Sequence, residues 1–358
     1  MGTNCSRCDI LQSETQNELT RKSLKPKADN TYAASFISND NDSYSNQEQK
    51  IIMLQKQIRR FLTQNNSIRS HVPNVSLEKL YQGDTVTRSK NFEYISPKKS
   101  DKNYVENYPI NDLATYTGEL KDGVQNGKGL QIWKDGARYE GEWVNGKANG
   151  YGVFYHIDGD IYKGMWKDDK ANGEGTYISA DGVNYEGHWE DDFQNGYGIE
   201  TWKDGSSYKG NYVLGKKQGY GEYTWSDGSK YAGNWFDNFH EGYGTYTWND
   251  NNVYTGFFKK NVIEGEGHFT WPDGREYIGQ FAKGKKNGIG KYIWNDGREY
   301  IGYWVNGKQH GLGLYTNEVK EKMWGIWING KRTRWLEEKD LEEIKNDDCY
   351  KEIINFNK

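Results

Sequence analysis

The first eight residues of the chain, MGTNCSRC, carry a pattern for covalent lipid attachment. Removal of Met1 would expose Gly2, and Ser6 stands where substrates of N-myristoyl transferase carry Ser or Thr. A single myristoyl chain gives only marginal membrane binding, at ~0.8 kcal/mol per buried methylene, so stable attachment needs a second anchor. Cys5 and Cys8 lie within reach of a membrane-bound acyltransferase and are candidates for palmitoylation. We predict lipidation at Gly2, Cys5 and Cys8; the alternative is a chance pattern with two idle thiols.

A second candidate site lies in residues 51–64, IIMLQKQIRRFLTQ, whose apolar residues have helical spacing. These apolar residues are Ile51, Leu54, Ile58 and Leu62. Three residues resemble the opening of an IQ motif, the basic amphipathic helix that calmodulin-like proteins bind: Leu54, Gln55 and Arg59. The motif's following glycine is Arg60 here, and its later basic residue is Gln64. Two interpretations stay open, calmodulin binding and a short helix that packs on the protein or on a neighbour.

Other residues that could do chemistry do not form a catalytic pattern. Five lysines end a G-x-x-x-x-G-K sequence, the first part of a phosphate-binding loop: Lys147, Lys216, Lys285, Lys308 and Lys331. That loop also needs Ser or Thr after the lysine and a helix after a strand, and we expect neither here. The six histidines lack the H-x-x-x-H or cysteine spacing of a metal site. We therefore expect no catalytic, cofactor or metal site, and no enzyme.

The composition argues against a large globular enzyme. Of the 358 residues, 34% are hydrophobic and 15% aromatic, and the mean hydropathy is -1.05. The net charge of -4 and the pI near 6.0 argue against nucleic acid as a partner. No apolar run approaches the ~18 residues of a membrane-spanning helix, and no secretory segment begins the chain. Three cysteines cannot form a disulfide framework, so we expect a location on the cytosolic side.

The rest of the chain is organised around a sequence repeat of 23 residues, which runs from Tyr116 to Lys331. Nine repeats begin with a tyrosine: Tyr116, Tyr139, Tyr162, Tyr185, Tyr208, Tyr231, Tyr254, Tyr277 and Tyr300. In a tenth repeat, Met323 takes the place of the tyrosine. A glycine follows two residues later, and a large apolar residue, mostly tryptophan, two residues after that. A G-x-G pair comes next in nine repeats. A fixed period of this length indicates a repeat array.

Each repeat contains two strand signals joined by a turn. From Gly219 to Trp235, apolar residues or glycines alternate with polar ones on both sides of an Asp-Gly turn, which is the signature of a hairpin. Glycine weakens the middle of a strand, so its presence there needs a reason. We expect the bare backbone at Gly233 or Gly244 to leave a hollow where a Tyr or Trp ring of the neighbouring strand lies flat. Such contacts would build the apolar layer from rings over glycines.

Tyrosine, glycine and tryptophan would share one face of the hairpins, because residues two apart in a strand point to the same side. The most regular members of this aromatic-glycine face are Tyr139, Gly141, Trp143, Tyr162, Gly164, Trp166, Tyr185, Gly187, Trp189, Tyr231, Gly233, Trp235, Tyr300, Gly302 and Trp304. We predict that partners contact either this face or the polar face opposite.

The pattern Y-x-G-x-W followed by N-G-x-x-x-G-x-G, as in residues 139–152, resembles the MORN repeat, named for membrane occupation and recognition nexus. The resemblance covers residues 116 to about 331. The end copies depart from it, with Leu120 for Trp in the first and Met323 for Tyr in the tenth, which lacks the G-x-G pair. The resemblance implies a β-hairpin ribbon that acts in scaffolding, protein assembly and membrane apposition. Members occur in junctional membrane proteins, ciliary radial spokes, parasite cortical cytoskeleton and plant phosphoinositide kinases.

We predict a mainly β fold, an elongated single-layer antiparallel ribbon of about ten hairpins with a right-handed twist. The expected parts are a disordered lipidated tether at 1–50, a short IQ-like amphipathic helix at 51–64, a linker at 65–115, the MORN repeat array at 116–331 and a capping helix at 332–358. The linker should become ordered near Ile110.

Together these features predict a non-catalytic scaffold, tethered by lipid to the cytosolic face of a membrane, whose repeats bind protein partners or cytoskeleton. The alternative is a regulatory module that binds phosphoinositides or other phospholipids, although the repeats carry no basic face that demands it. The sequence leaves open a plasma or ciliary membrane, cytoskeletal or ciliary partners, calmodulin binding and the pairing of two ribbons into a homodimer. We do not expect nucleic acid as a partner.

Overall fold

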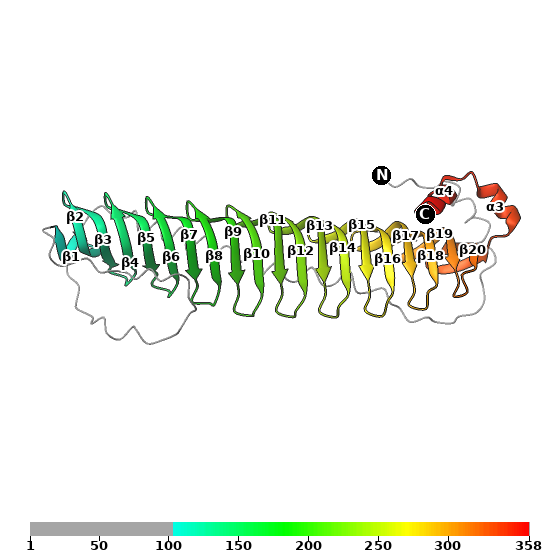
Figure 1. The fold of residues 1–358 in the computed structure, drawn as a ribbon, viewed down its shortest axis with the longest axis horizontal. Coiled ribbons are helices and arrows are strands. Elements are labelled where there is room, and N and C mark those ends of the chain that lie inside the picture. Colours follow the sequence, from blue (N-terminus) through cyan, green and yellow to red (C-terminus); the bar gives the residue numbers. More distant parts are fainter. Residues whose placement is uncertain (1–102, 358) are drawn as a thin grey trace. The chain divides into compact units, whose positions relative to one another are not determined.

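A computed structural model describes residues 103–357; the predicted tether and IQ-like helix, residues 1–50 and 51–64, lie outside this range. The described chain divides into two compact units, which we call the first unit, residues 103–216, and the second unit, residues 217–357. Within each unit, hairpins follow one another in a single layer (Figure 1). The prediction of a mainly β fold of antiparallel hairpins is confirmed.

Within the first unit, each strand from β1 to β9 pairs antiparallel with the next strand along the chain. The strands are β1 (Tyr104–Asn111), β2 (Ala114–Lys121), β3 (Val124–Trp133), β4 (Arg138–Val144), β5 (Lys147–Tyr155), β6 (Ile161–Lys167), β7 (Lys170–Ile178), β8 (Asn184–Glu190), β9 (Phe193–Thr201) and β10 (Ser207–Val213). β1 and the start of β2 lie in the segment 65–115 that the sequence predicts as a linker. β1 pairs with β2 and so covers the edge that the first repeat would otherwise leave open.

The second unit continues the same alternation and ends in two helices. Its elements are β11 (Lys216–Thr224), β12 (Lys230–Phe236), β13 (Phe239–Thr247), β14 (Val253–Lys259), β15 (Val262–Thr270), β16 (Glu276–Ala282), β17 (Lys285–Ile293), β18 (Glu299–Val305), β19 (Lys308–Thr316), β20 (Lys322–Ile328), β21 (Lys331–Trp335), α3 (Glu338–Ile344) and α4 (Asp348–Phe356). Here too each strand pairs antiparallel with the next.

Two kinds of turn join the strands. At the first, Asn145 and Gly146 both have positive φ angles, 52° and 79°, as a type I′ hairpin turn requires. At the second, the Asp-Gly turn, Asp135 Oδ1 accepts a hydrogen bond from the Ala137 N–H at 3.0 Å. The five lysines of the G-x-x-x-x-G-K sequences each begin a strand after a turn of the first kind: Lys147, Lys216, Lys285, Lys308 and Lys331. They therefore lack the helix that a phosphate-binding loop needs.

The core of each unit is a layer of tyrosine rings over glycines. Tyr231 in the second unit is fully buried, and its ring lies over Gly233 in its own strand and over Gly244 in the next strand. A Cβ atom added at Gly244 would lie 2.6 Å from the Tyr231 hydroxyl, so only glycine fits. The prediction of rings over glycines is confirmed, with the difference that each ring also covers a glycine of its own strand.

A β-bulge after the glycine in the tyrosine's own strand explains why the neighbouring residues are Tyr and Trp. The pairing of β12 with β13 shifts between Gly233 and Trp235. The Tyr231 hydroxyl donates a hydrogen bond to the intervening carbonyl of Asn234, at 2.8 Å. The indole Nε1–H of Trp235 donates to the Gly221 carbonyl of β11, at 3.1 Å. Both bonds recur in the first unit, so the side chains satisfy carbonyls around the bulge.

The C-terminal segment caps the second unit, but not as the one helix predicted at 332–358. β21 first adds a strand, and the helical part then divides into α3 and α4 because the Asp347 side chain accepts a hydrogen bond from the Cys349 N–H and starts a new helix. Ile353 of α4 is fully buried in a cluster with Leu312 of β19 and Ile326 of β20. Figure 1 shows α4 beside β18 and β19.

Candidate functional site

The predicted site residues fall into two groups. The lipidation and IQ-like residues precede the described part of the chain: Gly2, Cys5, Cys8, Leu54, Gln55 and Arg59. The aromatic-glycine face lies in both units, and its tyrosines are buried, as Tyr139 and Tyr300 illustrate at 0% exposure. Burial also raises the pKa of Tyr139 above its ordinary value, so its hydroxyl stays protonated and donates to the Glu142 carbonyl. This face is the packing layer of the repeats, and other side chains form the surface.

Next to the Asp-Gly turns, the second unit has a continuous row of aromatic rings, which we call the ring ladder. Its members are Trp225, Tyr246, Trp248, Phe269, Trp271, Tyr292, Trp294 and Tyr315. The centroids of successive rings are between 4.4 and 6.2 Å apart. The four tryptophans are half-buried, so part of each ring faces solvent. Sequence reasoning included Trp225 only in the alternation from Gly219 to Trp235 and did not separate this row; the available signal was the Trp before each turn.

Lys286 lies between the ladder and the buried layer, enclosed by two rings of each. Its Nζ is 4.3 Å from the ring centroid of Tyr292, 4.9 Å from Trp271, 5.0 Å from Trp304 and 5.2 Å from Tyr277. Burial and the nearby Arg275 guanidinium lower the pKa of Lys286 to about 7. The faces of the aromatic rings favour a higher pKa of Lys286, because they attract the charged ammonium. The aromatic layer of this unit therefore accommodates a cation.

His240 occupies the same repeat position two repeats earlier. Its ring stacks on Tyr231, with centroids 3.8 Å apart and an interplanar angle of 17°. Burial lowers the pKa of His240 to about 3, so the imidazole is neutral at pH 7. The other repeats place different residues here: Gln125, Ala148, Ala171, Gln194, Lys217, Ile263, Gln309 and Arg332. This position tolerates many side chains, whereas the tyrosines and glycines around it recur.

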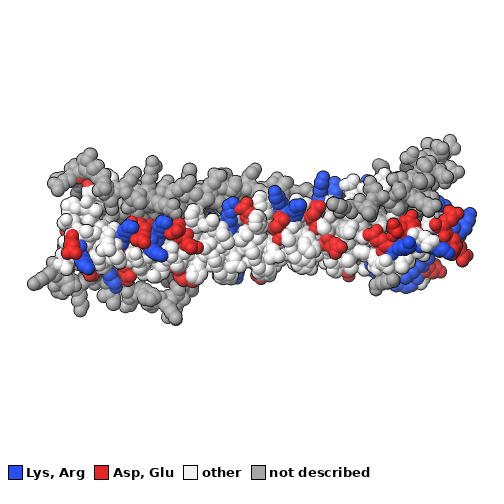
Figure 2. Space-filling view, turned by 90° about the horizontal axis from the view of Figure 1, so that it is seen from above, with Lys and Arg blue, Asp and Glu red and all other residues white. Residues whose placement is uncertain are grey.

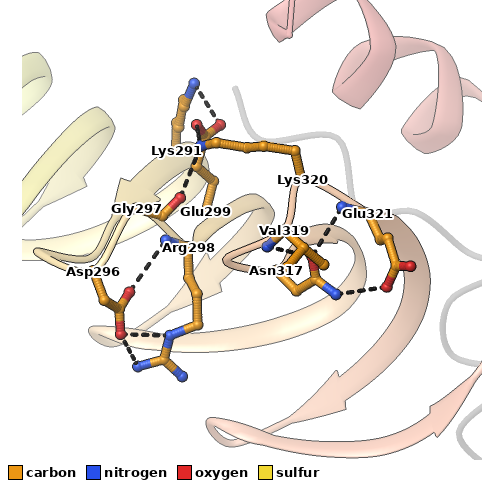
Figure 3. A network of polar contacts seen from close by, with 9 residues as sticks. All are labelled: Lys291, Asp296, Gly297, Arg298, Glu299, Asn317, Val319, Lys320 and Glu321. Atoms are coloured by element: carbon orange, nitrogen blue, oxygen red, sulfur yellow. Dashed lines mark hydrogen bonds and ion pairs between the residues drawn. The ribbon is translucent and has the colours of Figure 1, made fainter.

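The ladder ends in a network of polar contacts, where Asn317 replaces the tryptophan of the next turn (Figure 3). Lys320 has a φ of 68°, the value that glycine usually adopts in these turns. Its Nζ donates a hydrogen bond to the Gly297 carbonyl of the preceding turn, at 3.0 Å. Arg298 in that turn pairs with Asp296 at 2.7 Å. These contacts link two turns and leave the charges beside the ladder paired.

The corresponding row in the first unit is interrupted by polar side chains. The position before the turn passes from Trp133 to His156 and Ser179 and returns to tryptophan at Trp202, which is buried. In β9, Glu200 occupies the repeat position that holds an aromatic ring in the ladder. It accepts a hydrogen bond from the Tyr212 hydroxyl at 2.8 Å. The first unit therefore has no continuous ladder within residues 103–216.

The face opposite the tyrosine-glycine layer, which we call the outer face, carries apolar side chains at fixed register positions. Tyr243 of β13 pairs across strands with Phe257 of β14, and they are 53% and 48% exposed. Two and three repeats later, the position of Tyr243 is taken by Ile289 and Leu312, which belong to the cluster buried with α4. The first unit exposes Tyr151, at 40%, in the same register. The outer face is thus apolar and partly uncovered.

Charged side chains of both signs alternate over the surface seen in Figure 2. In the first unit, Lys147 pairs with Asp168 at 3.4 Å and Lys170 with Asp191 at 3.1 Å. Such exposed pairs contribute only ~0–1 kcal/mol each to stability. Within residues 103–357, no group of His, Cys, Asp and Glu is arranged to hold a metal ion. Among the described helices, none is long and apolar enough to cross a membrane.

Nine successive segments of the chain match the model of the MORN repeat. They are residues 116–138, 139–161, 162–183, 185–207, 208–230, 231–253, 254–274, 277–297 and 300–317. Because the matches cover more than half of the chain, the chain belongs to the MORN repeat family. The tenth predicted repeat, which opens at Met323, is outside the matches, although β20 continues the pairing of strands there.

No curated protein matches the chain in sequence. Among solved structures, the G-box domain of the microcephaly protein CPAP aligns with a TM-score of 0.34 and 14% identity, over 53% of this chain and 99% of that one. The TCP domain of SAS-4 from Drosophila melanogaster, solved with a proline-rich motif of Ana2, aligns with a TM-score of 0.28 and 15% identity, over 43% of this chain and 85% of that one. Likeness at these TM-scores carries no argument about function.

Proposed function

We propose that this chain is a non-catalytic scaffold whose MORN repeats bind protein partners, cytoskeletal ones included, at the cytosolic face of a membrane. Lipid on Gly2, with Cys5 or Cys8 as the second anchor, tethers it there. Membership of the MORN repeat family supports the repeat scaffold. The N-terminal sequence MGTNCSRC supports the tether.

The apolar positions of the outer face support the proposed binding of partners. In the second unit, α4 packs on the apolar positions that include Leu312, whereas Tyr243 and Phe257 remain exposed at equivalent positions. A sheet face that packs against an amphipathic helix of its own chain offers the same chemistry to an apolar segment of a partner. The exposed positions are therefore where we expect partner proteins to dock.

The tether is tested by fractionation of full-length protein from eukaryotic cells. Gly2→Ala should move the protein from the membrane fraction to the soluble fraction, because palmitoylation depends on prior membrane contact. Cys5→Ser with Cys8→Ser keeps the myristoyl chain and should leave only marginal binding. Unchanged membrane recovery of Gly2→Ala would contradict the tether. Sedimentation of unlipidated protein with anionic vesicles separates the tether from direct phospholipid binding, which the mixed charges on the face in Figure 2 do not favour.

The binding role is tested by proximity labelling from the intact protein in the same cells. Tyr243→Ser with Phe257→Ser should lose labelled partners, because both changes remove apolar surface without adding charge. Thr245→Ser, on the same face of β13, is the matched control and should keep them. Identical sets of partners for the double variant and the control would contradict a binding role for this face.

A further inference from the structure

Four tryptophans of the ring ladder have a hydrogen-bond donor that the fold does not use. They are Trp225, Trp248, Trp271 and Trp294, each half-buried and directly before a hairpin turn. No group within residues 103–357 accepts a hydrogen bond from their indole N–H. The tryptophans of the buried layer differ, since five of them donate to glycine carbonyls at 3.1 to 3.2 Å: Trp143, Trp166, Trp189, Trp235 and Trp304. The ladder donors are available to a ligand.

The sheet sets the spacing of these four indoles. They follow β11, β13, β15 and β17, so neighbouring indoles are two strands apart. A strand separation of ~4.8 Å makes this step about 9.6 Å. One turn of a polyproline II helix contains three residues at ~3.1 Å each, or about 9.3 Å. A polyproline helix that crosses the strands would therefore place one residue per turn on each indole, over roughly 12 residues.

Charge complementarity favours the same ligand. A proline-rich segment has few N–H donors, and its polyproline conformation leaves the carbonyl oxygens unpaired. The ladder presents donors, namely the four indole N–H groups, and two guanidinium groups that are paired with Asp273 and Asp296 lie over its rings. Arg275 lies over Trp271 at 5.3 Å, and Arg298 lies over Trp294 at 5.4 Å. The positive ends of these donors would meet the partial negative charge of the carbonyls, while the rings offer flat apolar surface to the pyrrolidine rings.

Two other occupants fit less well. Single-stranded nucleic acid also stacks on aromatic rings, but it needs a positively charged surface for its phosphates. Here Arg275 pairs with Asp273 at 2.7 Å and Arg298 pairs with Asp296, so little net charge remains. A segment of this chain is excluded by composition, because the chain has 5 prolines and no two are adjacent. The ligand therefore belongs to another protein.

We propose that the ring ladder binds a proline-rich segment of a partner protein in the polyproline II conformation, with one turn of the segment on each of the four indoles. This inference rests on the proposed scaffold function and specifies the class of partner. It is carried by the spacing of the rings and by the free indole donors.

The test uses the full-length protein and two fluorescein-labelled dodecapeptides, one of L-proline and one of D-proline, measured by fluorescence anisotropy. The D peptide has the same composition but forms the mirror-image helix, which cannot keep its carbonyls on the indole donors. We expect the L peptide to bind at least about tenfold more tightly. Equal affinities would overturn the proposal, and so would no binding of the L peptide at up to about 1 mM.

Substitutions in the ladder test the role of the donors. Trp248→Phe with Trp271→Phe keeps the rings but removes two N–H groups, and should weaken binding of the L peptide by about tenfold. Ile157→Ser, at an exposed turn of the first unit, is the control and should bind like the unmodified protein. Unweakened binding by the double variant, or equal weakening by the control, overturns the proposal. Tighter binding of a labelled twelve-nucleotide DNA strand than of the peptide also overturns it, in favour of nucleic acid.

Failure of the ladder proposal can be distinguished from failure of the proposed scaffold function. If the L peptide does not bind but proximity labelling still finds partners that depend on Tyr243 and Phe257, the scaffold stands and the ladder proposal falls. If the peptide binds and the Trp248→Phe, Trp271→Phe protein loses labelled partners that contain proline-rich segments, the ladder proposal is supported directly.

Discussion

The first and second units share one repeat and one layer of tyrosine rings over glycines, but the rows of side chains beside their Asp-Gly turns differ. In the first unit the position before the turn changes from Trp133 to His156 and Ser179, and its last tryptophan, Trp202, is buried. In the second unit tryptophan occupies this position at four successive turns, and the rings stay in contact. The two units thus keep the same core while presenting different surfaces.

The difference shows which positions the fold constrains. Gly152 in the first unit and Gly244 in the second face a tyrosine ring in the same way, so neither has room for a Cβ atom. Side chains beside the turns are not enclosed by neighbouring rings in this way. They can therefore change without loss of the sheet. The repeating residues therefore report on the fold, and the variable residues at the turns and on the outer face are where we propose that each unit binds its partners.

Alanine at the covered glycines should have the largest effect, and the same effect in both units. A Cβ atom at Gly152 would lie 2.3 Å from the Tyr139 hydroxyl, and one at Gly244 would lie 2.6 Å from that of Tyr231. Displacement of the ring also leaves a carbonyl without its donor, so each change should lower the free energy of unfolding by roughly 3 kcal/mol or more. Denaturant titration measures this. Gly228→Asn, at a position that the next repeat fills with Asn251, is the control and should cost far less.

Acid should destabilise the second unit through His240. Burial lowers its folded-state pKa to about 3 from an ordinary 6.5, so the unfolded chain binds a proton between these values and the folded chain does not. Stability therefore falls as pH falls through this window, by about 3 kcal/mol between pH 6.5 and pH 4. His240→Gln, which copies Gln194 of the first unit, should remove this part of the loss. Parallel stability curves for both proteins across this range would show that His240 is not responsible.

Loss of the cap should affect the end of the second unit. Ile353→Ala removes a fully buried side chain from the cluster under α4 and should cost about 2 kcal/mol locally. In a Cys5→Ser, Cys8→Ser background, Cys349 is the remaining thiol, and its reaction with a thiol reagent should accelerate when α4 detaches. The exposed substitution Lys351→Ala is the control. An unchanged rate in Ile353→Ala would mean that α4 stays in place without this contact.

Transfer of one residue between the units should weaken peptide binding. Trp248→Ser gives the ladder the side chain that interrupts the first unit at Ser179, and should reduce the affinity for the L-proline peptide by about tenfold. Ile157→Ser changes an exposed turn residue of the first unit and should have no effect. Equal affinities of the Trp248→Ser protein and the unmodified protein would remove the functional meaning of the difference between the units.

The sequence predicts those parts of the structure that have a local sequence signal. Two-residue alternation, Asp-Gly turns and a fixed period indicate the hairpins and the buried layer. β1 escapes prediction because it lacks the repeat pattern and Asn107, with a φ of 53°, interrupts its alternation. The division between α3 and α4 depends on one cap at Asp347. The ring ladder escapes because the exposure of residues such as Trp248 depends on how neighbouring strands cover them, which spacing along the chain does not contain.

The central claim is that the second unit exposes unused indole donors in a row that matches a polyproline helix. Nuclear magnetic resonance of protein with ¹⁵N-labelled indoles, assigned by single Trp→Phe changes, tests it during addition of the L-proline dodecapeptide. We predict that the N–H signals of Trp225, Trp248, Trp271 and Trp294 shift, while those of Trp143, Trp166, Trp189, Trp235 and Trp304, which bond to glycine carbonyls, do not. Ladder signals that stay in place, or equal shifts of the bonded indoles, would contradict the claim.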